Sequence, residues 1–500
     1  TITNLDGAGG MRALTSVKAE LSRRQRIFAD FQVNHINGYM RLFKEGAAAE
    51  PIPHLFIISD EFAELKKEQP EFMKELVSAA RIGRSLGVHL ILATQKPAGI
   101  VDEQILSNSR LRLCLKVQNE SDSKEILKTP DAADITRPGR AYMQVGNNEV
   151  YEMFQSAWCA APYRETEEQT GTYDERVYAV NEFGQGELVN RDLSGRKEEY
   201  RACMTQLEAV ASLLGEVFEE EGAAEVRKPW LPPLEEMIVS PYAQAGAVRS
   251  GLTVSLGMTD IPGMQEQREL EHDFAGEGNL LFAASSGFGK TVFLTTVLMS
   301  LAISNDVDDL NYYILDYGNN GCMPLKELPH TAEYISADDE ERYWKFKKLI
   351  TEEIALRKRL FAGYAASSRE AYQELSGKSM KAVMIVIDQL DVVRESGIEE
   401  EEFFTKLTRD GAGLGIYTVA SVNRVNAVRL ATLNNFPKKI AGYNFDENET
   451  FQTVGRTKYR QSDIKGRVLV SGENVHEAQI YVMAPCKDKT MYGRALKGLV

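Results

Sequence analysis

The chain has 500 residues, with 43% hydrophobic and 26% charged side chains and a formal net charge of −15. These values are typical of a globular protein, and the length predicts two or three domains because it exceeds what one ordinary core supports. The net negative charge argues against nucleic-acid binding over a large surface, which would have to be basic. It does not exclude a local basic channel. No apolar run reaches the roughly 18 residues of a membrane-spanning helix.

The chain starts at Thr1 rather than Met and carries no signal peptide. We therefore expect a piece of a longer protein, with a membrane anchor outside this sequence. The cysteines are dispersed, odd in number and without a C-x-x-C pair, which predicts reduced thiols rather than disulfides or zinc ligands. They are Cys114, Cys159, Cys203, Cys322 and Cys486.

An internal repeat organises the chain. A short apolar run at 54–59 ends in Asp60 and another at 383–387 ends in Asp388, as buried parallel strands would. After each Asp, a Leu-Gly pair ends 27 positions later and opens a further apolar run. Four matched features are separated by 333, 328, 328 and 327 residues. The matched pairs are Arg24 and Arg357, Asp60 and Asp388, Gly87 and Gly415, and Gly139 and Gly466.

The repeat predicts the fold class. Strands alternate with helical stretches in both copies, which predicts tandem α/β domains, each a mainly parallel sheet with helices on both faces. Between the copies, 176–188 is strand-like and is expected to close the first domain's sheet, and 200–221 is typical of an acidic helix.

A proline-rich segment follows that helix. Pro229, Pro232 and Pro233 forbid a helix and favour an extended conformation. The apolar stretch 230–234, which begins at Trp230, either occupies a groove on a neighbouring domain or is a stiff spacer. We expect domains at 1–223 and 251–500, joined by a linker at 224–250.

A phosphate loop follows the linker. The apolar strand 279–284 leads into a Gly-rich loop, and 292–303 then reads as a helix, which is the context that a P-loop requires. Lys290 would reach the β- and γ-phosphates of ATP, and the Thr291 hydroxyl would bind Mg²⁺. Ala284 stands where the pattern has its first Gly. The candidate nucleotide-binding loop is Ala284, Ser285, Ser286, Gly287, Phe288, Gly289, Lys290 and Thr291.

The strand-ending acids supply the rest of the site. Asp388 is the candidate Mg²⁺ ligand beside Thr291. It is followed by Gln389, which cannot accept a proton, so we expect the second site to bind ATP but to hydrolyse it poorly. Asp60 is followed by Glu61, a candidate general base or, alternatively, a surface carboxylate. The counterpart of Lys290 would fall before Thr1, so we expect the first domain to begin after its own phosphate loop.

Three further side chains are candidates. Gln95 and Asn423 follow the strand after each acid, where an amide can hydrogen-bond the γ-phosphate or the attacking water, or alternatively cap a loop. Arg84 has Ala412 as its counterpart. An arginine present only in the copy with Glu61 suits an arginine finger for a neighbouring site, with a surface ion pair as the alternative.

Two segments, 60–65 and 84–97, resemble the FtsK/SpoIIIE ATPases, and the resemblance extends over both copies. It implies RecA-like P-loop NTPase domains of the additional-strand class, with Arg84 close to a neighbouring subunit's nucleotide. The tandem, unequal domains resemble the membrane-anchored type VII secretion ATPases, the EssC/EccC kind. This resemblance implies a place on the cytoplasmic side of the membrane, self-association into a ring, and contacts with other membrane subunits. It also implies export of WXG-type proteins, recognised by their C-terminal signals.

Two other functions are compatible with the sequence. A DNA translocase of the FtsK/SpoIIIE type is the main alternative, although such motors usually carry one motor domain and a small DNA-reading domain. Here the copies are unequal, the charge is acidic, and no basic C-terminal module follows. Alternatively, the last domain is an ATP-dependent binding module without motor activity.

Overall fold

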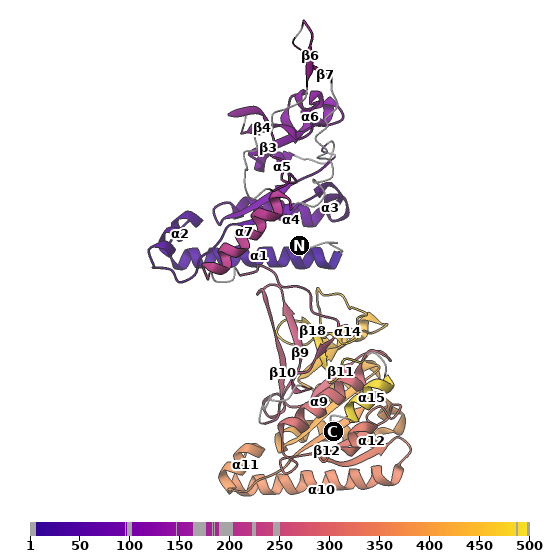
Figure 1. Ribbon diagram of the computed structural model, residues 1–500. Coiled ribbons are helices and arrows are strands. Elements are labelled where there is room, and N and C mark those ends of the chain that lie inside the picture. Colours follow the sequence, from indigo (N-terminus) through magenta and orange to yellow (C-terminus); the bar gives the residue numbers. More distant parts are fainter. Residues whose placement is uncertain are drawn as a thin grey trace. The chain divides into compact units, whose positions relative to one another are not determined.

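The computed structural model describes residues 7–95, 97, 103–146, 148–163, 177–182, 184, 186–189, 204–222, 227–243, 251–486 and 489–497. The chain divides into two compact units, Thr1–Pro229 and Trp230–Val500 (Figure 1). None of the described helices is long and apolar enough to cross a membrane.

The described part of the second unit is built around one sheet of eleven strands. The strands are β8 (Ile238–Val239), β9 (Thr253–Ile261), β10 (Glu266–Asp273), β11 (Leu280–Ala283), β12 (Leu310–Asp316), β13 (Thr331–Ser336), β14 (Ala382–Asp388), β15 (Ile416–Val422), β16 (Lys438–Ala441), β17 (Arg467–Val470) and β18 (His476–Val482). The helices are α8 (Phe274–Glu277), α9 (Lys290–Ser304), α10 (Glu340–Tyr364), α11 (Arg369–Ser376), α12 (Ile398–Asp410), α13 (Leu430–Leu433), α14 (Glu447–Val454) and α15 (Lys489–Lys497).

The order of the strands is β10-β9-β18-β17-β16-β11-β15-β14-β12-β13, with β8 beside β18. The run from β16 to β13 is parallel, and β17, β18, β9 and β10 extend it in antiparallel fashion. The prediction of a mainly parallel sheet is therefore confirmed. Strand β15 lies between β11 and the acidic strand β14, which is the arrangement of the additional-strand class.

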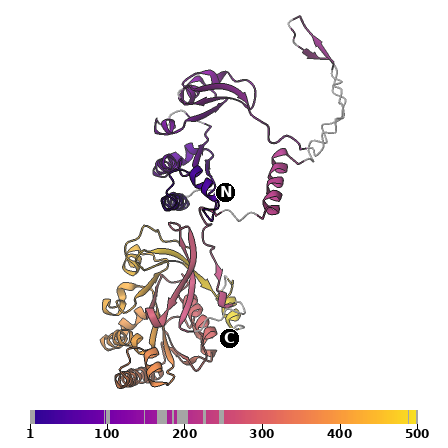
Figure 2. The same cartoon turned by 90° about the vertical axis from the view of Figure 1, so that its left-hand side faces the viewer.

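Helices lie on both faces of this sheet (Figure 2), and a hydrophobic core fills the space on each side. One contains Met384 and Val386 of β14 with α9 and α15, and the other contains Ile385 and Ile387 with α10, α11 and α12. Every residue of β14 is buried, because a parallel strand between two helical layers has no solvent face. This packing explains why the sequence of β14 reads as a continuous apolar run.

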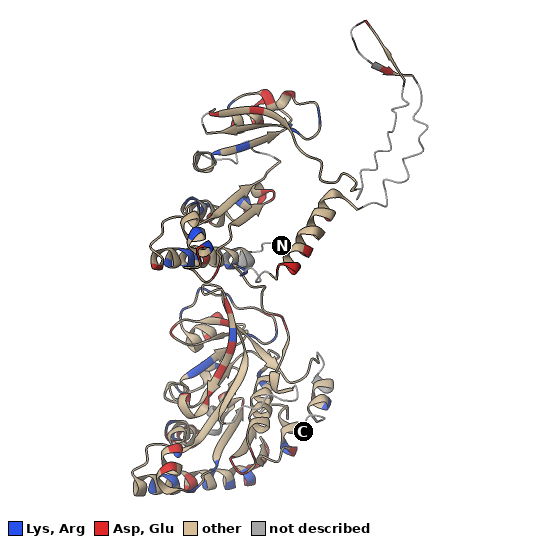
Figure 3. Ribbon diagram, turned by 60° about the vertical axis from the view of Figure 1, so that its left-hand side comes forward, with Lys and Arg blue, Asp and Glu red and all other residues tan. Residues whose placement is uncertain are grey.

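The long helix α10 buries one apolar face against the sheet. Phe346, Ile350, Ile354 and Phe361 recur at helical spacing and are buried against the sheet. Elsewhere on the helix, Lys and Arg are interspersed with Glu (Figure 3), as in the pair of Lys345 with Glu341 at 2.5 Å. Such mixed charge favours solvation rather than a continuous basic surface.

The described first unit contains three separate sheets, β1-β2, β3-β4-β5 and β6-β7. Its strands are β1 (Leu55–Ser59), β2 (Val88–Leu92), β3 (Leu111–Leu115), β4 (Arg140–Val145), β5 (Val150–Gln155), β6 (Tyr178–Val180) and β7 (Gly186–Leu188). The helices are α1 (Gly7–Asp30), α2 (Ile36–Lys44), α3 (Phe62–Glu68), α4 (Pro70–Gly83), α5 (Glu103–Asn108), α6 (Glu120–Leu127) and α7 (Gln206–Glu220).

The repeat extends to strand register. Leu55 pairs with Val88 in β1 and β2, and Val383 pairs with Ile416 at the matching place in β14 and β15. Strands β3, β4 and β5 correspond in order to β16, β17 and β18. In the second unit β11 joins these two groups, and the described residues of the first unit include no counterpart of β11. Phe56 of β1, at the position of Met384 in β14, is 59% exposed. Met384 packs in a core with α9, and the described residues of the first unit include no counterpart of that helix.

Each copy of the repeat contains a buried arginine that donates hydrogen bonds to backbone carbonyls of two other segments. Arg24 donates to the carbonyls of Leu86 at 2.8 Å and Pro53 at 2.9 Å. Arg357 donates to the carbonyls of Leu414 at 2.9 Å and Lys381 at 2.9 Å. Both arginines therefore fasten a long helix to the turn before a strand and to the residues that precede the acidic strand.

The segments between the copies differ from the expectations. The idea that 176–188 closes the first domain's sheet is wrong, because the described strands β6 and β7 pair with each other in a separate hairpin. The acidic helix is present as α7 from Gln206, while 200–203 lie outside the described residues.

Much of the proline-rich segment packs within the second unit. Leu234 is 7% exposed, and Arg467 donates to its carbonyl at 2.8 Å. Gln267 donates to the carbonyl of Pro232 at 2.8 Å, and β8 pairs with β18. Within the expected linker 224–250, residues 224–226 and 244–250 lie outside the described residues.

Candidate functional site

The phosphate loop connects the buried strand β11 to the helix α9. Gly287 and Gly289 have φ values of 92° and 91°, in the left-handed region that glycine adopts without steric cost. Ala284 is fully buried and keeps a negative φ. Alanine is therefore compatible with the position where the common pattern has glycine.

Lys290 begins α9 and is only 7% exposed. Its Nζ donates to the carbonyl oxygens of Ala284 at 2.8 Å and Ser285 at 2.9 Å. A buried ammonium needs such partners because its desolvation is costly. The amine thus lies within the loop, beside the N-terminus of α9, which favours negative charge.

Thr291 and Asp388 meet next to the lysine. Thr291 Oγ1 donates to Asp388 Oδ2 at 3.4 Å, and Ser421 Oγ donates to Asp388 Oδ1 at 2.5 Å. Burial raises the pKa of Asp388, and the charge of Asp316 adds to that effect. A hydroxyl and a desolvated carboxylate are oxygen ligands that suit Mg²⁺, whose charge would favour the ionised carboxylate.

Asp316 is a site residue that the sequence prediction missed. It pairs in register with Asp388 on the adjacent strand, and both carboxylates lie with the Cys322 thiol inside 4.8 Å. Asp316 accepts hydrogen bonds from the amides of Gly318 and Cys322, each at 3.0 Å, and from the Tyr334 hydroxyl at 2.9 Å. It therefore fixes the following loop. The sequence did contain a signal for Asp316, because this residue, like Asp388, ends an apolar run.

That loop, 317–322, lies against the Mg²⁺ end of the site. A Cβ on Gly318 would lie 2.8 Å from Asp388 Oδ2 and 2.8 Å from Gln389 Nε2. A Cβ on Gly321 would lie 2.6 Å from Thr291 Cγ2. Since real Cβ contacts are not this short, a side chain at either position would displace the loop or the site residues Asp388, Gln389 and Thr291.

Gln389 and Asn423 contact each other. Gln389 has a left-handed backbone with φ of 66°, and its backbone N–H donates to Ser421 Oγ at 2.9 Å. Asn423 Nδ2 donates to Gln389 Oε1 at 3.2 Å, and its backbone amide donates to Asp391 Oδ1 at 3.0 Å. The structure thus brings the predicted residues of the second site together at the carboxyl ends of β11, β14 and β15, the usual place for ligands in such sheets.

In the first unit, Glu61 is connected to the end of β2. Its oxygens accept hydrogen bonds from Thr94 Oγ1 at 2.6 Å and from the backbone amide of Gln95 at 3.0 Å. Asp60 and Gln95 are exposed, and Arg84 is exposed where α4 ends. The structure brings Glu61 and Gln95 together and places Arg84 apart, at the opposite end of β2.

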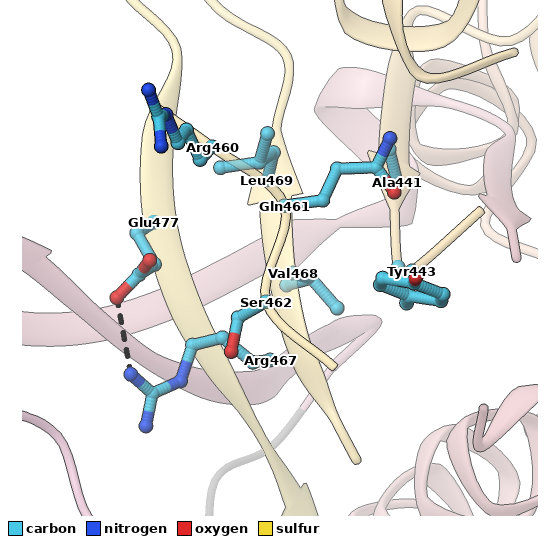
Figure 4. Close-up of a pocket in the computed structure, with 10 residues that line it drawn as sticks. Ala441, Tyr443, Arg460, Gln461, Ser462, Arg467, Val468, Leu469 and Glu477 are labelled. Carbon is cyan, nitrogen blue, oxygen red and sulfur yellow. Dashed lines mark hydrogen bonds and ion pairs between the residues drawn. The ribbon is translucent and has the colours of Figure 1, made fainter. Parts of the chain in front are cut away.

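A small cavity lies behind the loop that follows β16. It has a volume of about 10 Å³, which is room for about one water molecule. Figure 4 shows its wall, where the Arg467 guanidinium donates to Glu477 at 3.0 Å. The cavity is too small for a nucleotide base. Its residues are Ala441, Gly442, Tyr443, Arg460, Gln461, Ser462, Arg467, Val468, Leu469 and Glu477.

A phosphate loop facing a strand-ending Asp, with an additional strand between them, defines a P-loop ATPase of the additional-strand class. The chain belongs to the FtsK/SpoIIIE family, whose model matches residues 3–99 and 239–432.

The curated relatives and solved structures narrow this class. The chain is 44% identical over 510 residues to type VII secretion system protein EssC of Staphylococcus aureus (strain MRSA252), covering 100% of this chain and 34% of that protein. It thus spans about a third of the length of the curated relatives it matches.

Two solved structures share the fold. The cytoplasmic domain of the Thermomonospora curvata type VII secretion ATPase EccC has a TM-score of 0.78 and 23% identity, covering 100% of this chain and 56% of that one. ATPases 2 and 3 of the same EccC, in complex with a signal sequence peptide, have a TM-score of 0.50 and 14% identity, covering 96% and 77%.

Proposed function

We propose that the second unit binds ATP and Mg²⁺ and hydrolyses ATP poorly. One observation carries the proposal: Lys290 and Thr291, at the start of one helix, lie beside the buried carboxylate of Asp388. Bound Mg²⁺ would neutralise charge on the β- and γ-phosphate oxygens. Lys290 binds those phosphates, Thr291 and Asp388 hold the cation, and Gln389 and Asn423 orient water without taking its proton.

The first unit provides the catalytic carboxylate. Glu61 accepts two hydrogen bonds that orient it at the end of β2, which supports a role as general base. It would act on a nucleotide held by a phosphate loop, an element that the described residues of this unit do not contain. Gln95 would then contact the γ-phosphate or the water. Arg84, exposed directly after α4, would reach a neighbouring subunit's nucleotide.

At the level of the whole protein, we propose a part in type VII secretion. Similarity to EssC over the full chain supports this role. We infer that ATP binding and hydrolysis are coupled to export of small helical WXG-type proteins, recognised by their C-terminal signals. Ring formation, contact with other membrane subunits and a place on the cytoplasmic side of the membrane belong to the same proposal.

The alternative of a DNA translocase has less support. A net charge of −15 makes the average surface repel phosphate, and basic residues on α10 are interspersed with acidic ones. The deciding experiment titrates the chain with labelled duplex DNA and with a C-terminal peptide of a WXG-type protein, both at roughly 150 mM salt. We expect binding of the peptide only. Tight DNA binding with no peptide binding would replace secretion with DNA translocation.

A further inference from the structure

Three aromatic rings form a cluster beside the phosphate loop. The rings of Phe288 and Tyr443 have centroids 4.6 Å apart. The ring of Phe445 meets both edge to face, at 6.0 Å from Phe288 and 5.7 Å from Tyr443. Phe288 belongs to the phosphate loop itself, and the other two follow β16. The cluster therefore joins two loops at the same edge of the sheet.

Hydrogen bonds connect the same two loops. The backbone amide of Ser285 donates to the carbonyl of Tyr443 at 2.9 Å, and the amide of Phe445 donates to Ser285 Oγ at 3.1 Å. Ala283 and Ala441 pair in register on the parallel strands β11 and β16. The rings thus have a fixed position relative to the loop that would receive the phosphates.

Phe445 differs from its two neighbours in exposure. It is 77% exposed, whereas Phe288 and Tyr443 are half-buried, and Phe288 packs against the core. Two partially buried rings support an exposed third ring, whose free face can stack on a planar ligand. The neighbouring cavity of about 10 Å³ is too small for that ligand, which leaves the exposed ring of Phe445 as the surface available for stacking.

The order of strands indicates which ligand this is. On one side of β11 lie β15 and then β14, which ends at Asp388 in the Mg²⁺ end of the site. On the other side lies β16, which is followed by the rings of Tyr443 and Phe445. The two ends are separated by three strand spacings, roughly 14 Å. This separation is comparable with the length of an extended nucleoside triphosphate whose γ-phosphate lies beside Asp388.

We propose that Phe445, supported by Tyr443 and Phe288, stacks on the base of the nucleotide bound at Lys290. This inference rests on the proposed ATP site and adds its base subsite. Because every base has a π-face, stacking gives little discrimination between adenine and guanine. ATP and GTP are therefore expected to bind with affinities within a few-fold of each other.

The subsite is specific to the second unit. Asn119 caps α6 and Asp446 caps α14 at matching places after β3 and β16. One residue before the cap is Gln118 in the first unit and Phe445 in the second. Three residues before the cap, the corresponding pair is Lys116 and Tyr443. The first unit lacks both rings at these positions, so the two copies would hold a base differently.

The test compares Mg·ATP with inorganic tripolyphosphate, which has no base, by calorimetry on the full chain. Phe445→Ala is expected to weaken ATP binding about ten-fold and to leave tripolyphosphate binding unchanged. Phe445→Trp should restore the affinity for ATP, and its indole fluorescence should be quenched by the base. Trp344→Ala, which removes an aromatic ring that is 63% exposed on α10, is the matched control and should change neither affinity.

The other outcomes are distinct. Equal losses for ATP and tripolyphosphate would mean that Phe445 only braces the phosphate loop, and would overturn the stacking proposal. The stacking proposal would also be overturned if Phe445→Ala left the affinity for ATP unchanged. This outcome counts provided that tripolyphosphate binds the wild type and that Lys290→Ala abolishes tripolyphosphate binding. Failure of the wild type to bind either ligand would remove the ATP site itself, and the base subsite with it.

Discussion

Gln389 occupies in the second unit the place that Glu61 occupies in the first. Both residues come directly after a strand-ending Asp and have left-handed backbones, with φ of 66° and 53°. Such a conformation costs a non-glycine residue roughly 1–3 kcal/mol, so both units retain the same strain at the same position. Each residue also contacts the end of the following strand. The backbone is thus repeated, and the ability to accept a proton is not.

This relationship predicts very slow ATP hydrolysis by the chain. Gln389 cannot act as a base, and the described first unit offers Glu61 without a phosphate loop. Gln389→Glu should raise turnover modestly, because a carboxylate would then lie beside Asn423 in an unchanged backbone. Phosphate release at saturating Mg·ATP measures this. Motor-like turnover by the wild type that Lys290→Ala abolishes would contradict the assignment.

ATP binding at Lys290 should stabilise the second unit. A ligand at about 100 times its Kd adds about 2.7 kcal/mol to the free energy of unfolding. Thermal unfolding with and without Mg·ATP measures the shift, and Lys290→Ala should remove it. If wild type and variant shift equally, the nucleotide binds elsewhere.

Glu61 should become important in a longer chain that supplies a phosphate loop to the first unit. There, Glu61→Gln should preserve ATP binding and abolish hydrolysis, because the amide keeps the hydrogen-bonding shape and cannot take a proton. Arg84→Ala should reduce turnover only where subunits or domains pack against one another. Unchanged turnover in Glu61→Gln would show that another group is the base.

The glycine loop over the Mg²⁺ end offers a test of packing. Gly318→Ala places a Cβ 2.8 Å from Asp388 and Gln389, so we expect the free energy of unfolding to fall by about 1–3 kcal/mol. The Mg²⁺-dependent gain in ATP affinity should fall too, because the loop must shift at Asp388. Gly363→Ala, on α10 with no atom within 4 Å, is the control and should stabilise by about 0.5–1 kcal/mol. Equal effects of the two variants would exclude a special role for the loop.

The repeat, and the grouping of the candidate residues of the second site, could be predicted from the sequence because each motif is local. Strand-ending acids and a glycine-rich turn occupy short windows, and each has a direct structural meaning. The aromatic cluster could not be found in this way, since Phe288 and Phe445 are distant in sequence and meet only because β16 lies beside β11. The hairpin of β6 and β7 was misassigned because strand propensity does not specify a partner.

The repeated arginines show a similar limit. The match between Arg24 and Arg357 was visible in the sequence, but the role of each arginine depends on carbonyls from two segments that are distant in sequence. Arg357 is 3% exposed; besides its bonds to Leu414 and Lys381, it donates to Glu353 Oε1 at 2.7 Å. Loss of such a buried, fully bonded cation leaves several acceptors without partners.

Arg357→Ala should therefore lower the free energy of unfolding of the second unit by about 3–5 kcal/mol. Arg357→Lys should not restore it, because one ammonium cannot reproduce the planar set of donors that spans these carbonyls. Arg359→Ala, which alters an exposed side chain on the same helix, should change stability by less than about 0.5 kcal/mol. Urea unfolding, followed by spectroscopic probes in each unit, should show that Arg357→Ala lowers the free energy of unfolding of the second unit. Arg24→Ala should lower that of the first unit by a similar amount. A loss in Arg357→Ala no larger than in Arg359→Ala would show that the buried arginine does not hold α10 to the strands that position Asp388.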